Sequence, residues 1–129
     1  GYYLQIEPGK SFVGGGFWGP NAEDLLRIRE EIALDDELVQ ILNEPNFKSF
    51  YGEIQGESLK TAPKGFDKNH ERIELLRMKQ FLFTKSFSDE EVLASDFNRK
   101  VVEAFEKLRP FFEYMSDVLT TNSNGERRF

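Results

Sequence analysis

The sequence predicts an α+β domain in which an antiparallel sheet carries helices mainly on one face and a long, kinked helix lies at the C-terminal end. Residues 2–7 and 80–87 alternate with the two-residue period of half-buried strands, and other segments repeat apolar side chains every three or four positions, as amphipathic helices do. A chain of 129 residues can build one hydrophobic core but is small for two. We therefore predict one structural unit over residues 1–121 and a flexible tail over residues 122–129.

The N-terminal region predicts a β-hairpin. Residues 2–7 form its first strand, a Pro-Gly pair supplies the turn, and residues 11–18 form its second strand. Glycine inside a strand marks a bulge or a close approach of the backbone to another group. Three consecutive glycines occupy this second strand: Gly14, Gly15 and Gly16. We favour a bulge or tight packing under an aromatic side chain, and contact with a ligand is the alternative.

Two helices are predicted after the hairpin. Asn21 precedes apolar residues at helical spacing and caps a helix that extends to about Ala33. Asp35 or Asp36 caps a second, shorter helix, which Pro45 ends because the residue before a proline disfavours helical geometry.

The middle of the chain is the least regular part. We expect residues 46–69 to be mostly loop, with a short strand over residues 51–55. Asn69 then caps a helix whose buried face carries Ile73 and Leu76, and the strand over residues 80–87 follows.

The C-terminal third predicts a short helix and a long one. Ser88 and Glu91 have the spacing of a capping box, and Ser95 can cap the longest helix, in which Pro110 should produce a kink or a division near residues 106–109. The apolar stripe of this helix recurs every three or four residues: Phe97, Val101, Phe105, Leu108, Phe112, Met115 and Leu119.

Aromatic residues are numerous, and we assign them to the core. Base-stacking surfaces also need basic residues on the exposed strand face, and only Lys79 and Lys85 occupy such positions. The predicted core aromatics outside the long helix are Phe12, Phe17, Trp18, Phe81, Phe83 and Phe87.

Composition excludes several functions. The net charge of −6 argues against binding to a nucleic-acid backbone, and no apolar run reaches the roughly 20 residues that cross a bilayer. The absence of cysteine excludes disulfides, a thiolate nucleophile and cysteine-ligated metals, and it fits a cytoplasmic location. We therefore expect no nucleic-acid partner and no membrane partner.

One segment of this acidic chain is basic. Residues 60–85 carry seven basic and three acidic side chains together with the single histidine, near the start of a predicted helix whose free amides favour anions. The candidate anion-binding residues are Lys60, Lys64, Lys68, His70, Lys79 and Lys85. A solvated surface without a ligand is the interpretation we favour, because charge runs commonly serve solubility.

No residue pattern identifies a reaction. His70 lies close in sequence to Asp67 and Glu71, but residues placed in this way more often cap a helix than form an acid–base pair. Nucleotide-binding, hydrolase and calcium-loop motifs are absent, no spacing specifies a metal site, and nothing indicates a cofactor. We predict no metal.

The residues 1–9 and the segment Ser11-Phe12-Val13-Gly14-Gly15-Gly16 resemble the middle of a widespread, mainly bacterial family, domain of unknown function 2461. Residues 63–67 and 85–89 resemble later motifs of that family, so the similarity extends to about Leu119. Members of the family carry an additional N-terminal half with an Arg-Asp-x-Arg-Phe motif. The resemblance therefore implies that this chain is the C-terminal part of a single α+β domain, and it transfers no activity.

Two functional hypotheses remain open from the sequence. The first is a non-enzymatic module that binds an anionic small molecule or a protein partner. The second is an enzyme that acts on a phosphorylated or carboxylated substrate with groups from the N-terminal half. A concave site that joins Lys64, His70 and a carboxylate of shifted pKa would favour the enzyme, and a flat apolar patch would favour a partner surface.

Overall fold

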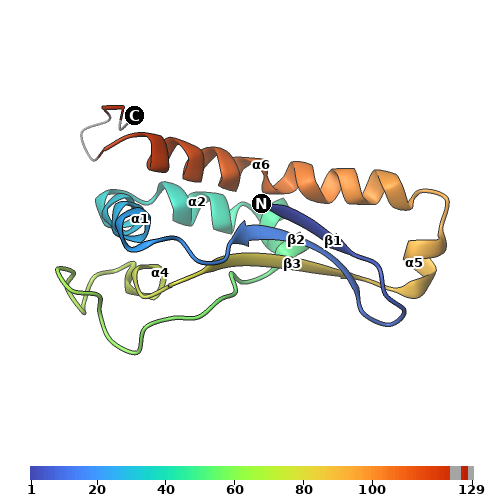
Figure 1. Cartoon of the computed structure of the whole chain (residues 1–129), viewed down its shortest axis with the longest axis horizontal. Helices are drawn as coiled ribbons and strands as arrows, with labels where there is room; N and C mark the ends of the chain where they lie inside the picture. Colours follow the sequence, from blue (N-terminus) through green and yellow to red (C-terminus); the bar gives the residue numbers. More distant parts are fainter. Residues whose placement is uncertain (123–125, 128–129) are drawn as a thin grey trace.

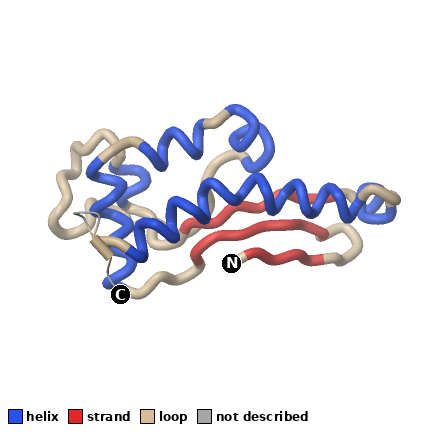
Figure 2. Tube along the Cα trace, turned by 90° about the horizontal axis from the view of Figure 1, so that it is seen from above, coloured by secondary structure: helices blue, strands red, loops and turns tan. Residues whose placement is uncertain are grey.

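The fold is a three-stranded antiparallel sheet with helices packed mainly on one face, which confirms the predicted class. In the computed structural model, which describes residues 1–122 and 126–127, the strands lie in the order β1 (Tyr2–Gln5), β2 (Ser11–Phe17) and β3 (Phe81–Phe87). Figure 1 shows the long helix α6 (Phe97–Thr120) across one face of the sheet. Seen from above in Figure 2, α6 runs along the strands, and most of the other helices gather at one end of them.

The predicted hairpin is confirmed, but it contains no bulge. The pairing of β2 with β3 steps one residue at a time from Ser11 opposite Phe87 to Phe17 opposite Phe81. The glycines allow close packing instead. A Cβ atom at Gly14 would lie 2.5 Å from the backbone oxygen of Phe83 and 3.0 Å from the Tyr3 hydroxyl, and the strand therefore tolerates only hydrogen there.

Helix α1 (Ala22–Leu34) follows the hairpin, as predicted. Its N-cap is Asn21, whose side-chain oxygen accepts a hydrogen bond from the Asp24 amide at 2.8 Å. The helix buries Ile28 and Ile32 completely against α6. Helix α2 (Glu37–Asn43) comes next, and its N-cap residue forms no side-chain capping bond.

A third helix, α3 (Pro45–Tyr51), replaces the predicted loop. Pro45 begins this helix as well as ending α2, because proline needs no amide partner in the first turn and its φ angle is already helical. The Glu44 carboxylate caps α3 by accepting hydrogen bonds from the amides of Asn46 at 3.1 Å and Phe47 at 2.8 Å. The predicted strand over residues 51–55 is wrong, since only Gln55 forms a β-bridge, with Leu82.

The helix that Asn69 was expected to cap begins later than predicted, and it is therefore shorter. Helix α4 (Ile73–Leu76) is a single turn with Arg72 at its N-cap. The Asn69 amide instead donates to Asp67 Oδ1 at 2.8 Å in the preceding turn. Leu76 is fully buried, as predicted.

The capping box before helix α5 (Asp89–Leu93) is confirmed in both directions between Ser88 and Glu91. The N-cap of α6 is Asp96 rather than Ser95, and it forms no side-chain capping bond. Helix α6 continues through Pro110, so the predicted division is wrong, whereas the kink stays a prediction.

The buried stripe of α6 is wider than predicted. Phe105 and Phe112 are only half-buried, and Phe111 between them is fully buried with its ring 4.9 Å from that of Phe83. The cause is that α6 packs on the sheet and also on α1 and α2. The buried residues of this helix are Phe97, Val101, Ala104, Leu108, Phe111, Tyr114, Met115 and Val118.

The face of the sheet away from α6 carries a smaller aromatic group. The ring of Tyr3 lies 5.5 Å from that of Phe12 and 5.6 Å from that of Trp18. Trp18 is 55% exposed, so its assignment to the core is wrong.

None of the described helices combines the length and the apolar character that a membrane-spanning segment needs.

At the C-terminal end, Thr121 forms a β-bridge with Arg127. Residues 123–125 and 128–129 of the predicted flexible segment lie outside the described residues. The expectation that residues 1–121 are the C-terminal part of a larger domain stays a prediction.

Candidate functional site

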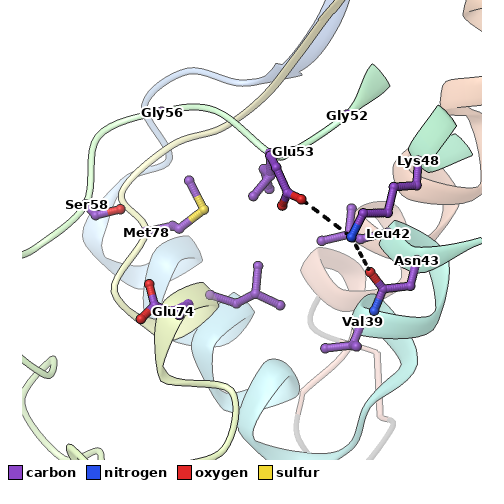
Figure 3. Close-up of a pocket in the computed structure, with 12 residues that line it drawn as sticks. Val39, Leu42, Asn43, Lys48, Gly52, Glu53, Gly56, Ser58, Glu74 and Met78 are labelled. Carbon is purple, nitrogen blue, oxygen red and sulfur yellow. Dashed lines mark hydrogen bonds and ion pairs between the residues drawn. The ribbon is translucent and has the colours of Figure 1, made fainter. Parts of the chain in front are cut away.

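A cavity of about 420 Å³ opens between α2, α3, α4 and the segment that follows α3. This volume suits a small organic molecule. Two other cavities lie between α2 and α6 and beside the β1–β2 turn, with volumes of about 460 and 300 Å³. The first cavity combines an apolar floor with side chains of both charges, as Figure 3 shows. Its lining residues are Val39, Leu42, Asn43, Lys48, Gly52, Glu53, Ile54, Gly56, Ser58, Glu74, Leu75 and Met78.

The joint between α2 and α3 sets one wall of this cavity. Because Glu44 caps α3 directly after α2 ends, the last turn of α2 and the first turns of α3 adjoin, which places Asn43 beside Lys48. Gly52 ends α3 with a φ angle of 70°, a conformation that favours glycine, and its amide bonds to the Lys48 carbonyl at 2.8 Å.

Residues 55–59 form the opposite wall because they follow the chain from Met78 to Leu82. Backbone hydrogen bonds of 2.7–2.9 Å join Gln55 to Leu82 in both directions, Lys79 to Glu57, and Leu59 to Arg77. A Cβ atom at Gly56 would lie 2.7 Å from the Gln80 carbonyl oxygen, so glycine permits this close approach. The wall is therefore fixed by backbone bonds although it is not a regular strand.

Charged groups occupy two sides of the cavity. The Lys48 ammonium lies 3.4 Å from Asn43 Oδ1 and 3.4 Å from Glu53 Oε1. Glu74 and Ser58 lie on the other side (Figure 3), and the Glu74 carboxylate forms no ion pair within the described part of the chain. The Glu53 side chain is 84% exposed, so its pair with Lys48 is a weak surface contact that a bound anion can replace.

The predicted anion-binding residues lie outside the lining of the cavity in Figure 3. Lys60, Lys64 and Lys68 are exposed on the loop before α4. Lys79 pairs with Glu57 at 3.5 Å, and the ammonium of Lys85 lies 5.2 Å from the centre of the Phe50 ring. None of these five lysines lines the cavity of Figure 3.

His70 has a local structural contact. Its Nδ1 accepts a hydrogen bond from the Arg72 amide at 2.9 Å. Asp67 accepts from the Asn69 amide, and Glu71 pairs with the Arg72 guanidinium at 2.6 Å. The described contacts of these side chains therefore do not form the acid–base arrangement that would favour an enzyme.

Gly14, Gly15 and Gly16 lie at the centre of the sheet, away from the cavity lining. A Cβ atom at Gly15 would lie 2.9 Å from Leu108 Cδ1, which places this glycine under α6. Gly16 has a φ angle of 148°, in a region that side chains rarely adopt.

Sequence reasoning missed the cavity residues because they come from four elements between positions 39 and 78. The only local signal was Glu44-Pro45, which marks the start of a helix as readily as the end of one.

Burial also raises the pKa of Tyr51, but its hydroxyl donates to the Ala104 carbonyl at 2.6 Å and belongs to the core.

The fold and its side cavity define a small α+β domain built on a helix-covered antiparallel sheet. The chain belongs to the family described as conserved hypothetical protein (DUF2461), whose model matches residues 1–114. That description names no activity, ligand or partner. No curated protein and no solved structure matches the chain.

Proposed function

We propose that this protein is a binding module for a small amphipathic molecule, which occupies the cavity between α2, α3, α4 and residues 52–58. The observation that carries the proposal is the placement of Lys48 and Glu74 on two sides of one apolar floor. An anionic group of the ligand pairs with Lys48 in place of Glu53. A cationic or N–H group of the same ligand pairs with Glu74, and its apolar part covers Leu42, Leu75 and Met78.

The charge balance of the cavity selects the ligand class. One ammonium and two carboxylates line the cavity, so a multiply charged anion such as a bare phosphate is disfavoured. A zwitterion of the apolar amino-acid type satisfies both charged sides. Nucleic acid remains unsuited to a chain of net charge −6, and the lack of cysteine supports a cytoplasmic location.

The proposal is tested by calorimetric and thermal-shift titration with leucine, methionine, short monocarboxylates, dicarboxylates and inorganic phosphate. We expect the apolar amino acids to bind and phosphate to have no effect. Lys48→Met and Glu74→Gln should each weaken binding by about tenfold, since each removes one charge-assisted contact.

Lys64→Met is the matched control, because Lys64 is an exposed lysine of the basic loop that does not line the cavity. It should bind like the unmodified protein. If Lys64→Met weakens binding and Lys48→Met does not, the ligand sits on the basic segment and the cavity proposal is wrong. A complete lack of response to every compound at millimolar concentration would contradict it as well.

A second candidate function, self-association through β1, rests on the open edge of the sheet. Within the described part of the chain β1 pairs only with β2, and on this edge Tyr2 is 47%, Leu4 39% and Ile6 60% exposed. Residues 2–6 carry no charged side chain, so two negatively charged copies could approach there and pair edge to edge. Sedimentation velocity should then show a dimer that Leu4→Lys dissociates, and a monomer at high protein concentration would exclude this pairing.

A further inference from the structure

Three carboxylates converge where α1 meets α2, away from the cavity of Figure 3. Glu31, Asp35 and Glu37 each offer an oxygen atom, and these three atoms lie within 4.8 Å of one another. The break between the helices brings them together. Asp35 has an extended backbone at the end of α1, and its Oδ1 accepts a hydrogen bond from the Glu37 amide at 3.0 Å, which turns the chain into α2.

The negative charge of this group is only partly balanced. Arg27 Nη1 lies 2.9 Å from Glu31 Oε2, but Nε and Nη2 of this guanidinium donate to the Thr121 and Asn122 carbonyls at 2.7 and 2.9 Å. No basic residue occurs in the last turn of α1, where the helix dipole is negative. One arginine therefore faces three carboxylates.

Several like charges surround the Glu37 carboxylate. Partial burial and the charges of Asp35, Glu31 and Asp117 raise the pKa of the Glu37 carboxyl group above its usual range. The charge of Asp117, from α6, thus adds to that of the three clustered carboxylates. A bound cation would relieve this repulsion.

A buried hydroxyl provides a second, independent observation. Tyr114 of α6 is 4% exposed, and its hydroxyl is the one buried side-chain polar atom among the described residues that has no hydrogen-bond partner. Helix α6 packs against both α1 and α2, and, after burial, the nearby charges of Glu31, Asp35 and Glu37 are the main causes that raise the pKa of Tyr114. Buried polar groups without a partner are rare, and an ordered water or ion is a common reason for them.

We propose that Glu31, Asp35 and Glu37 bind a hard divalent cation of the calcium or magnesium type, and that a water molecule coordinated to this cation forms a hydrogen bond with the Tyr114 hydroxyl. The ligands are oxygen atoms only, without histidine or cysteine, and carboxylate and water oxygens are the preferred ligands of these two ions. Water completes the coordination shell, because Asp35 and Glu37 are exposed to solvent. The bound cation joins α1, α2 and the C-terminal part of α6.

The test is thermal unfolding and calorimetry of the chelator-treated protein with CaCl2 and MgCl2, compared with NaCl at equal ionic strength. For a dissociation constant of about 1 mM, a concentration of about 10 mM should raise the unfolding temperature by about 4 °C. Asp35→Asn and Glu37→Gln should each weaken cation binding by about tenfold or more, because each removes a charged ligand.

Glu90→Gln is the matched control, since Glu90 is an exposed carboxylate in the first turn of α5 outside the cluster. It should retain the full response to the cation. Equal responses of all three carboxylate variants would mean unspecific screening and would overturn the proposal, as would a response to NaCl as large as that to CaCl2.

Terbium(III) luminescence locates the ion, because a nearby tyrosine sensitises the emission of this hard cation. Tyr114→Phe should abolish most of the sensitised emission and weaken calcium binding by about tenfold, as the loss of an outer-shell hydrogen bond does at metal sites. Unchanged emission and unchanged affinity in Tyr114→Phe would show that the ion does not lie beside this hydroxyl, and the proposed site would be wrong.

Discussion

The Tyr114 hydroxyl allows a stability test that depends on the solution conditions. Tyr114→Phe removes one oxygen atom and leaves the ring, which is buried against the core. In the presence of a chelator the hydroxyl has no partner among the described residues, and an unpaired buried hydroxyl costs about 1–3 kcal/mol. We therefore expect Tyr114→Phe to raise the free energy of unfolding by about 1 kcal/mol, which for this chain length raises the unfolding temperature by about 4 °C.

The measurement is urea unfolding followed by circular dichroism, in chelator and again in calcium. In calcium the coordinated water pairs with the hydroxyl, so the advantage of the variant should disappear. Tyr51→Phe is the matched control, because Tyr51 is also 4% exposed but its hydroxyl donates to the Ala104 carbonyl at 2.6 Å. This control should lose about 1 kcal/mol under both conditions. A loss of stability in Tyr114→Phe with chelator present would refute the reasoning, since it would mean that the hydroxyl already has a partner.

Three further predictions concern stability. Gly14→Ala should lower the free energy of unfolding by about 3 kcal/mol in urea unfolding, because the new Cβ atom would lie 2.5 Å from backbone that cannot move aside. Arg72→Met should lower the free energy of unfolding by about 2–3 kcal/mol in the same assay, since the guanidinium donates to the Ile32 and Ala33 carbonyls near the end of α1 at 2.7 and 3.0 Å. Its control, Arg99→Met on the exposed face of α6, should lower it by less than about 0.5 kcal/mol. The raised pKa of Glu37 means that the folded state holds this proton more tightly than the unfolded state, so the group lowers stability as the pH rises from about 4.5 through the raised pKa. Without divalent cations, Glu37→Gln should therefore be more stable than the unmodified protein at pH 7 by about 0.3 kcal/mol after salt screening. Below about pH 4 the two proteins should have the same free energy of unfolding. A variant that is less stable at pH 7 would contradict the reasoning.

Much of the fold follows from local patterns in the sequence. Alternation with a period of two predicts the first and third strands, and the turn after the first strand predicts its hairpin partner. Side chains that accept hydrogen bonds from free backbone amides, such as Asn21 and the Ser88–Glu91 box, predict where helices begin. These capping signals can be recognised in the sequence because each capping side chain and the backbone amide that it pairs with are only three residues apart.

The errors occur where one residue permits two structures. Pro45 can end one helix or begin another, and only the packing of Phe47 and Tyr51 into the core decides for the second. Trp18 lies on the face of the sheet that α6 does not cover, which a strand pattern alone cannot reveal. The cavity was missed for a related reason, because its residues meet only after distant elements have packed. The carboxylate cluster was missed because the turn between α1 and α2, rather than the spacing of its residues, brings Glu31, Asp35 and Glu37 together.

The arginines of the basic segment have structural partners in the fold, and the segment as an anion-binding site stays a prediction. Arg72 donates to carbonyls of α1, and Arg77 donates to the Leu59 carbonyl at 2.8 Å. Arg29 reaches in the opposite direction, to the Leu76 and Met78 carbonyls at 2.7 and 3.1 Å. An irregular segment leaves backbone carbonyls without regular partners, and the planar guanidinium group can bind two of them at once. The positive charge between residues 60 and 85 is thus partly explained by the need to hold a loop-rich stretch against α1. Among the lysines of that stretch, Lys79 pairs with Glu57 and Lys85 lies over the Phe50 ring, whereas Lys60, Lys64 and Lys68 are exposed to solvent.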